Sequence, residues 1–321
     1  MCDRRLGSFS FDSGPFRAAR SIAHKCPQRR WKPHPGGSRN SSTAEPRLSI
    51  CVNFAGLPGF NYAAQSMSAE LRPTILRFET IDSTNLEAIR RAKAGADEGT
   101  CIVAREQTAG RGRLDRRWHS PKDAGLYLSV LLRPTLPKND WPLLSLMSAL
   151  AVVDALSKTC GISTDIKWPN DILANDRKLC GVLAETTQTS KGLAAIIGIG
   201  INLTREAVPT ELRGTATSIA EIVGYDPNAE SVLTELLGSI SGRYEGLQAD
   251  GGGEHTIREW CANSSFATER AVRVSLGADS FEGITRGLEA DGALRVETSN
   301  GQIRIVRAGD VTAVRPNTVT S

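Results

Sequence analysis

From about residue 71 onward, hydrophobic and polar residues follow regular patterns that predict strands and helices in alternation. Pro73–Thr80 alternates with the period of two that is typical of a half-buried strand. Asp82–Asn85 then places capping residues ahead of hydrophobic residues at helical spacing. This pattern predicts an N-capped amphipathic helix that ends near Gly95.

Longer apolar runs predict the remaining elements of this region. Two short strands are predicted at Cys101–Glu106 and Leu126–Leu132. Two further strands, which we expect to be buried neighbours, are predicted at Lys178–Glu185 and Leu193–Leu203. The predicted helices are Trp141–Cys160, which Gly161 would end, and Ser231–Leu247. Between them, Ile166–Asp171 has the pattern of a strand edge that is broken by a turn.

The pattern changes again near residue 268, where short β segments follow one another at close spacing. These segments are Ala271–Leu276, Gly283–Leu288, Leu294–Thr298 and Ile303–Val306. Turn residues separate them, so we expect a small antiparallel barrel. The chain is therefore predicted to consist of an extension over 1–70, an α/β domain over 71–266 and a small β domain over 267–321.

Residues 1–70 are rich in Arg, Ser, Gly and Pro and show no sustained period. We interpret them as disordered, as an organelle-targeting segment, or as translation from an upstream start with Met67 as the true initiator. No helix-turn-helix pattern is present there. The spacing of His24, Cys26 and His34 matches no zinc site.

The net charge of +4 is unevenly distributed along the 321 residues. Residues 1–50 contain ten Lys/Arg and three Asp/Glu, a net of +7, so the rest of the chain carries −3. A nucleic-acid-binding core would carry a basic patch on the fold itself, so the composition argues against that class. The seven dispersed cysteines indicate reduced thiols and a cytoplasmic protein. No uninterrupted apolar run is long enough to span a membrane.

A loop rich in glycine and arginine is the strongest candidate for a binding element. Four arginines lie within residues 111–117, beside Gly110, Gly112 and Trp118. Glycines allow the backbone to approach a ligand closely, and arginines supply planar, charged donors. Such a loop suits a phosphate with a ring attached, although a solvated basic turn has the same composition.

Other polar residues stand at predicted strand ends, and each has an ordinary structural explanation. Ser83, Thr84 and Asn85 can simply cap a helix. Gly198 and Gly200 form a lone G-x-G within a strand, a pattern that more often marks tight packing than phosphate binding. The chain contains no P-loop pattern, which disfavours an ordinary P-loop kinase or ATPase.

Taken together, six short motifs carry more information than any one of them. In chain order they are DSTN (82–85), EQTAGRGR (106–113), RRWHSP (116–121), KWPND (167–171), KLCGVLAE (178–185) and GIGIN (198–202). In this order and spacing the chain resembles the biotin–protein ligases (biotin–acetyl-CoA-carboxylase ligases) over about residues 71–318. The resemblance implies a mixed-sheet α/β (α+β) catalytic domain related to class II tRNA synthetases, followed by an SH3-like barrel. It also implies the enzyme-only type, without the DNA-binding domain of some relatives.

The resemblance assigns a role to each motif. The implied reaction joins biotin to ATP as biotinyl-5′-AMP and then transfers biotin to a lysine of a biotin carboxyl carrier domain. The implied catalytic residues are Lys178, Arg113 and Arg111. The implied biotin-binding residues are Ser83, Thr84, Asn85, Gln107, Arg111, Gly112, Arg113 and Lys178. The implied ATP-binding residues are Gly110, Arg113, Trp118, Asn170, Asp171 and Asn202. Mg²⁺ would accompany ATP, near Asp171, and no permanent cofactor is implied.

The sequence departs from the family pattern at the arginine loop. Relatives commonly have a small or basic residue and then Gly after the G-R-G-R core, where this chain has Leu114 and Asp115. Asp115 adds a negative charge near the phosphates and removes a flexible joint. His119 stands where a hydrophobic residue is usual, and we expect it to line the loop base instead of acting as a base.

Three alternatives remain open from the sequence. A lipoate–protein ligase would share the fold and the central lysine, but its glycine triplet and downstream His-Asp are missing here. A non-catalytic biotin- or nucleotide-binding regulator would need a DNA-binding element. An inactive ligase is suggested by Asp115. The expected partner is a biotin carboxyl carrier domain, with no nucleic acid or membrane, and a homodimer is left open.

Overall fold

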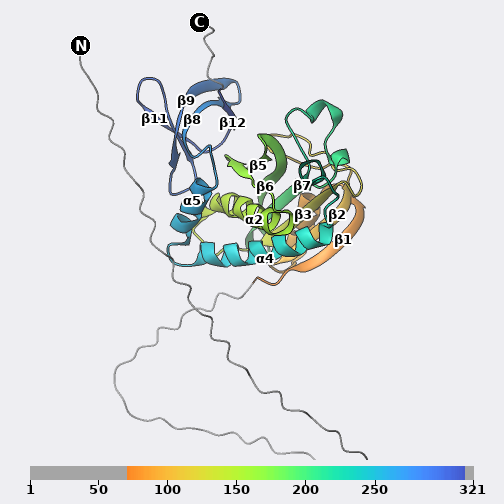
Figure 1. The fold of residues 1–321 in the computed structure, drawn as a ribbon. Helices are drawn as coiled ribbons and strands as arrows, with labels where there is room; N and C mark the ends of the chain where they lie inside the picture. Colours follow the sequence, from red (N-terminus) through yellow and green to blue (C-terminus); the bar gives the residue numbers. More distant parts are fainter. Residues whose placement is uncertain (1–70, 315–321) are drawn as a thin grey trace, which may run out of the picture. The chain divides into compact units, whose positions relative to one another are not determined.

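The structure, a computed structural model, describes residues 71–314, and the predictions made for residues 1–70 lie outside this range. Its first sheet has seven strands: β1 (Thr74–Ile81), β2 (Thr100–Gln107), β3 (Gly125–Leu132), β4 (Asp165–Lys167), β5 (Asp171–Ala174), β6 (Arg177–Thr189) and β7 (Gly192–Asn202). The order across the sheet is β1-β2-β3-β7-β6-β5-β4 (Figure 1). β1 and β2 run parallel and the other neighbours antiparallel. The predicted mixed sheet is confirmed.

The helices are α1 (Thr84–Lys93), α2 (Leu143–Cys160), α3 (Ile219–Val223), α4 (Ala229–Gln248) and α5 (Gly252–Ala262). Short 3-10 turns lie at Lys138–Asp140, Arg205–Ala207 and Thr210–Leu212. The predicted helices at α1, α2 and α4 are confirmed. Gly161 ends α2 in the left-handed conformation that glycine adopts without a steric penalty.

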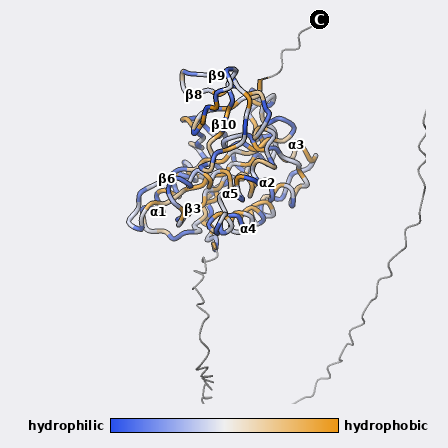
Figure 2. Tube along the Cα trace, turned by 90° about the vertical axis from the view of Figure 1, so that its left-hand side faces the viewer, coloured by the Kyte–Doolittle hydropathy of each residue, from blue (hydrophilic) through white to orange (hydrophobic). Residues whose placement is uncertain are grey.

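Helices cover both faces of the large sheet. In β3, Leu131 packs with Ala88 and Ala92 of α1. Val130 and Leu132 of the same strand belong instead to the core that contains α2 and α4. Because successive side chains of a strand point to opposite faces, a strand covered on both sides is apolar throughout. The hydrophobic stretches of the chain accordingly lie inside the domain, around β3 and α2 (Figure 2).

α2 is the central helix of the larger core. Among the described residues it alone is long and apolar enough to cross a membrane. Its residues nevertheless pack inside the protein, with Leu144, Met147 and Leu150 each about 1% exposed. Full burial of such side chains stabilises the fold by about 1.5–3 kcal/mol each. α2 is therefore a core helix of this domain.

The last third of the described chain forms the second sheet. Its strands are β8 (Thr268–Leu276), β9 (Asp279–Leu288), β10 (Leu294–Glu297), β11 (Ile303–Val306) and β12 (Asp310–Ala313). They are all antiparallel, in the order β11-β10-β9-β8-β12. Four of these strands were predicted, and β12 was not. The indole of Trp168 donates to the Gly292 carbonyl (3.1 Å), which ties this sheet to the turn after β4.

Two helices were also missing from the sequence-based prediction. α3 has only five residues, too few to show a period. α5 begins within Gly251-Gly252-Gly253, and a glycine run is a loop signal in sequence. It becomes a helix because Trp260, fully buried, fixes one side of it in the core.

Candidate active site

A cavity opens beside the seven-stranded sheet, where the sequence motifs meet. It is lined by Ser83, Thr84, Asn85, Gln107, Arg111, Gly112, Arg113, Arg116, Arg117, Trp118, Asn170, Asp171, Lys178, Gly181, Val182, Leu183, Gly198, Ile199, Gly200 and Asp310. Residues from all six motifs, which are far apart in the sequence, therefore line one cavity. Of the predicted site residues, only Gly110 and Asn202 are missing from this lining.

The start of α1 forms one end of the cavity. The backbone N–H of Thr84 donates to Oε1 of Gln107 (2.8 Å), and the Thr84 hydroxyl donates to the same oxygen (3.1 Å). Gln107 in turn donates to the Ser120 hydroxyl (2.8 Å). Ser83 is the N-cap residue, as predicted, but its side chain makes no capping hydrogen bond. The Gln107 amide therefore takes over part of the capping that we expected from the DSTN side chains.

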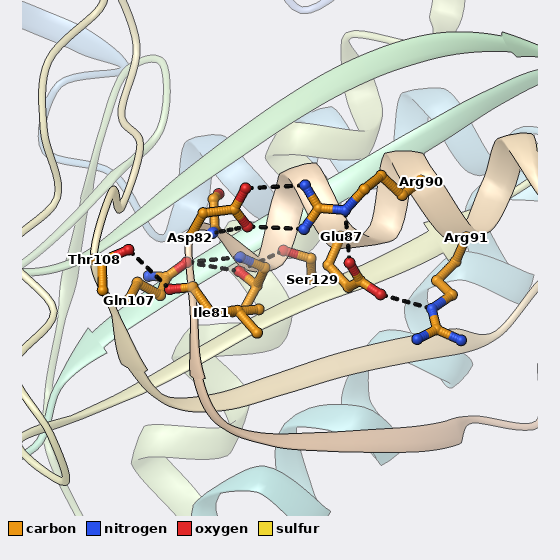
Figure 3. A network of polar contacts seen from close by, with 10 residues as sticks. Ile81, Asp82, Glu87, Arg90, Arg91, Gln107, Thr108 and Ser129 are labelled. Atoms are coloured by element: carbon orange, nitrogen blue, oxygen red, sulfur yellow. Dashed lines mark hydrogen bonds and ion pairs between the residues drawn. The ribbon is translucent and has the colours of Figure 1, made fainter.

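A chain of ion pairs fixes this end of α1 from the outside (Figure 3). Arg90 pairs with Asp82 (2.8 Å) and with Glu87 (2.7 Å), and Arg91 also pairs with Glu87 (2.7 Å). The hydrogen bond from Arg90 is the main reason that the pKa of Asp82 is lowered to about 2. Asp82 thus stays ionised and its carboxylate accepts from the Ser83 N–H (2.7 Å). This network holds the start of α1, and with it the next three residues of the chain, Ser83, Thr84 and Asn85, in place.

Two polar residues that the sequence analysis did not single out complete this end of the site. Ser129 of β3 is fully buried, with its hydroxyl 2.6 Å from Oδ1 of Asn85. Asn85 also donates to the Glu185 carboxylate (2.8 Å), and Arg111 pairs with Glu185 at 3.0 Å. Glu185 therefore links the start of α1 to the arginine loop. The only sequence signal for it was its place at the end of KLCGVLAE.

The arginine loop is a small hairpin. Arg111 and Arg117 form an isolated antiparallel bridge, and the Gly112 N–H donates to the Arg116 carbonyl (2.7 Å). At the tip, Leu114 and Asp115 have φ values of 54° and 57°. Non-glycine residues lose about 1–2 kcal/mol each in this left-handed region, and Asp tolerates it better than Leu. The departure from the family pattern thus places two strained residues at the tip of the loop.

Contacts on three sides hold the hairpin over the cavity. Arg111 reaches Glu185 on β6, as described above. Arg113 donates to Oδ1 of Asn170 (3.3 Å) and to the carbonyl of Gly309 (3.3 Å), just before β12. Arg116 forms an ion pair with Asp310. The second sheet therefore contributes to a site that the sequence analysis placed in the first domain alone.

Lys178 stands on β6 beside the turn that follows β4. Its ammonium nitrogen lies 2.6 Å from Asp171 and 5.3 Å from the centre of the Trp118 ring. Lys167 approaches the same carboxylate at 3.6 Å. Asp171 thus holds the Lys178 ammonium at the cavity wall, where it can meet a ligand's negative charge. The catalytic role that the resemblance implies for Lys178 stays a prediction.

The floor of the cavity is made of glycines from β6 and β7. A Cβ atom on Gly200 would lie 2.5 Å from the Trp118 indole, and one on Gly198 would lie 2.0 Å from Oδ1 of Asn85. Gly181 is also close, since its Cβ would lie 3.0 Å from the Trp118 ring. The G-x-G pattern therefore marks tight packing, as expected, and the packing serves the site.

We expect Gly200→Ala to displace the Trp118 indole, because no Cβ can occupy a position 2.5 Å from it. Overpacking of this kind costs about 1–3 kcal/mol. Urea unfolding followed by circular dichroism measures the loss. Gly214→Ala is the matched control, since a Cβ there meets nothing within 4 Å. Equal stability of the two variants would contradict this account of the floor.

The cavity carries an excess of positive charge. Five of its lining residues are Arg or Lys and two are Asp. Burial lowers the pKa of Arg113, while the carboxylates of Asp310 and Asp171 oppose that effect. Arginine remains charged in proteins, so its partly desolvated guanidinium attracts anions more strongly than an exposed one would. The site is built for a ligand, or a pair of ligands, with several negative charges.

Three residues of interest lie outside the lining. Gly110 is buried beneath the loop, where a Cβ would lie 2.4 Å from the Trp118 carbonyl. Asn202 is buried and donates to the Thr217 carbonyl (2.9 Å). His119 is exposed and does not line the cavity, and its expected place at the base of the loop stays a prediction. The nucleotide-binding roles of Gly110 and Asn202 stay predictions.

The cysteines and clustered acidic residues within 71–314 offer no second kind of chemistry at the site. No group of three or more His, Cys, Asp or Glu residues in this range could hold a metal ion. The four cysteines described there, Cys101, Cys160, Cys180 and Cys261, are free thiols. Burial raises the pKa of Cys180 far above its usual value, so the thiol nearest Lys178 in the sequence is held neutral. The cavity's own chemistry is that of its amine, its guanidinium groups and its polar side chains.

Comparison with known proteins agrees with this geometry. Residues 77–202 match the model of the biotin/lipoate A/B protein ligase family. Residues 269–312 match the model of the biotin protein ligase C terminal domain. The first match spans the cavity-forming elements from β1 to β7, and the second spans the sheet that supplies Asp310.

Similar sequences and structures carry related names. A biotin–[acetyl-CoA-carboxylase] ligase of Paracoccus denitrificans is 35% identical over 72% of this chain and 96% of its own. One from Mycobacterium tuberculosis is 34% identical over 73% of this chain and 86% of its own. A structure of the biotin protein ligase from Aquifex aeolicus in complex with biotin and ATP covers 75% of this chain and 98% of its own. It has a TM-score of 0.65 and 31% identity.

Proposed function

Since the chain belongs to the biotin/lipoate A/B protein ligase family, we propose that its cavity performs the biotin–protein ligase reaction with ATP. It is an ATP-dependent ligase that biotinylates a carboxylase. The observation that carries the proposal is the meeting of Lys178, Arg111 and Arg113 over one cavity.

The first step joins two anions. An oxygen of the biotin carboxylate attacks the α-phosphorus of ATP, the bond to the β-phosphate oxygen breaks, and pyrophosphate leaves. Negative charge increases between the reactants, so fixed cations accelerate the step. We assign Lys178 to the junction of carboxylate and α-phosphate, and Arg111 and Arg113 to the phosphate and acyl ends. Lys178 suits the junction because an ammonium is a compact point charge.

The ring of biotin is proposed to lie near the start of α1. A ureido group has donors and acceptors, and leaving one of them unpaired in an apolar pocket costs about 1–3 kcal/mol. Ser83, Thr84 and Gln107 supply both kinds of partner, and Asn85 supports them from below. Gly112 allows the loop backbone to come close to the ligand.

The nucleotide is assigned to the opposite side of the site. Trp118 offers a flat face, and Asn170 and Asp171 line the adjoining wall. Oxygen atoms of Asn170 and Asp171 are the kind of ligand that Mg²⁺ prefers, with phosphate oxygens and water completing its shell. Mg²⁺ held there would neutralise charge on the phosphates. Asn202 and Gly110 are proposed to assist the nucleotide from outside the present lining.

The second step releases the product. The neutral amine of an acceptor lysine attacks the acyl carbon, the bond from that carbon to the phosphate oxygen breaks, AMP leaves, and the proton that the amine loses passes to solvent. Until then the mixed anhydride must be kept from water, which the arginine hairpin achieves by covering it. We propose a biotin carboxyl carrier domain as the acceptor. A cytoplasmic location and a homodimer stay predictions.

The experiment that tests this function compares two acids. The protein is incubated with Mg²⁺–ATP and either biotin or lipoate, and pyrophosphate is measured. We expect release with biotin, and then transfer of radioactive biotin to a carrier domain. Release with lipoate alone would replace the proposal by a lipoate–protein ligase. Release with neither acid would leave an inactive relative, as the unusual Asp115 suggested.

A further inference from the structure

The second sheet reaches the arginine hairpin through two adjacent residues. Arg116 pairs with the Asp310 carboxylate, and Arg113 donates to the Gly309 carbonyl at 3.3 Å. Asp310 also lines the cavity itself. One short segment, at the start of β12, therefore touches the hairpin on both sides of its tip.

Close packing and strand pairing hold this segment. Gly309 is buried with φ at 131°, and a Cβ there would lie 2.7 Å from both Leu276 and the Ser275 carbonyl. Asp310 then pairs with Ser275 in the β8–β12 ladder. Because the ladder fixes the Asp310 backbone, the carboxylate is attached to the fold at a defined point from which it pairs with Arg116.

The hairpin needs such an anchor because its own tip disfavours the observed shape. Leu114 and Asp115 both adopt positive φ, and Leu114 is 63% exposed, so no burial of its side chain offsets the strain. External contacts must therefore keep the hairpin in place. Those on the first domain are Arg111 with Glu185 and Arg113 with Asn170.

From these contacts we infer that Asp310 is a positioning residue: through Arg116 it holds the hairpin over the bound acyl-adenylate, so the second sheet controls how long the intermediate is retained. This inference rests on the proposed function and adds a residue to it. The Asp310 carboxylate does not touch the reacting atoms in this scheme. Its removal should therefore change the escape of the intermediate more than its formation.

The test is pyrophosphate release from the full-length protein with biotin and Mg²⁺–ATP, in the absence of any carrier domain. Retention of the intermediate limits the wild-type protein to about one pyrophosphate per active site, followed by slow release. We expect Asp310→Asn to raise the slow rate about two- to fivefold, the range that an exposed ion pair supports. Biotin labelling of a bystander protein such as serum albumin should rise by the same factor.

A double-mutant cycle distinguishes the ion pair from a general effect on the fold. The double variant Asp310→Asn/Arg116→Gln should leak no more than Arg116→Gln alone, because either single change already removes the pair. Leu114→Gly combined with Asp310→Asn should recover part of the retention, since glycine relieves the strain at the tip. Glu282→Gln is the matched control, because it removes the Glu282–Arg273 pair of the same sheet without touching the hairpin.

The outcomes separate the two proposals. A slow rate in Asp310→Asn equal to that of the wild type would overturn the role of Asp310 and leave the ligase function standing. Additive leakage in the cycle, or equal leakage in Glu282→Gln, would also overturn it. No initial release of pyrophosphate from the wild type would instead overturn the proposed function, and the positioning role with it.

Discussion

Lys178→Ala is expected to lower the rate of adenylate formation by about 10²–10³-fold while the fold stays intact. The change removes the one ammonium that lines the cavity within residues 71–314. Loss of a single preorganised group that stabilises transition-state charge typically costs this much. The lysine side chain is 34% exposed, so its pair with Asp171 contributes at most about 1 kcal/mol to stability. Single-turnover formation of biotinyl-5′-AMP and a thermal melt measure the two effects.

Lys167→Ala is the control for this experiment. Lys167 approaches the same Asp171 carboxylate, at 3.6 Å, but does not line the cavity. We expect it to retain most of the rate, because it alters the surroundings of Asp171 without removing charge from the cavity. Near-wild-type turnover of Lys178→Ala, or an equal loss in Lys167→Ala, would remove Lys178 from its proposed role.

Arg113→Gly is expected to release the intermediate, so that lysines on unrelated proteins become biotinylated. Arg113 connects the hairpin to Asn170 and to Gly309, and both contacts are lost in the variant. The glycine in this variant also makes the backbone of the hairpin more flexible next to the strained Leu114. We expect a rise in bystander labelling of about tenfold or more, well beyond the effect of losing the Asp310 pair alone. A streptavidin blot of a whole lysate measures it.

Arg113→Lys separates charge from geometry. Lysine keeps the positive charge but lacks the planar guanidinium group, whose Nη1 donates to both Asn170 and Gly309. If geometry holds the hairpin, Arg113→Lys should leak nearly as much as Arg113→Gly. If charge alone matters, it should behave like the wild type. If Arg113→Gly labelled no more unrelated lysines than the wild type, Arg113 would not hold the hairpin over the intermediate, whether by geometry or by charge.

Most of the fold could be predicted because its elements have strong local patterns. β3 and β7 are apolar except for Ser129 and the terminal Asn202, and α2 has a long apolar run ended by Gly161. Failures occurred where the local pattern is weak. β12 has four residues and exists through its pairing with β8, so nothing within Asp310–Ala313 announces a strand. α5 begins in glycines and depends on burial of Trp260.

In the candidate site, too, residues within strong local patterns could be predicted and residues without such a pattern could not. Motifs that contain glycine, arginine and lysine in a fixed order could be located in the sequence. Of the site residues predicted from them, all but Gly110 and Asn202 line one cavity. Three supporting residues were not found: Ser129, Glu185 and Asp310. Ser129 and Glu185 are ordinary polar residues within strands, and Asp310 belongs to another sheet. Their importance comes from what they contact, which no local pattern records.

The sequence by itself determined most strands of the first domain and its helices α1, α2 and α4, the family resemblance and the chemistry of the arginine loop. Only the tertiary structure decided that Glu185 braces Arg111, that Gly200 makes room for Trp118, and that the second sheet anchors the hairpin. The physical reason is the separation along the sequence of the residues that interact. Periodicity and turn preference arise between residues a few positions apart, whereas the contact of Arg116 with Asp310 joins residues 194 positions apart. Such a contact exists only after both sheets have folded and packed.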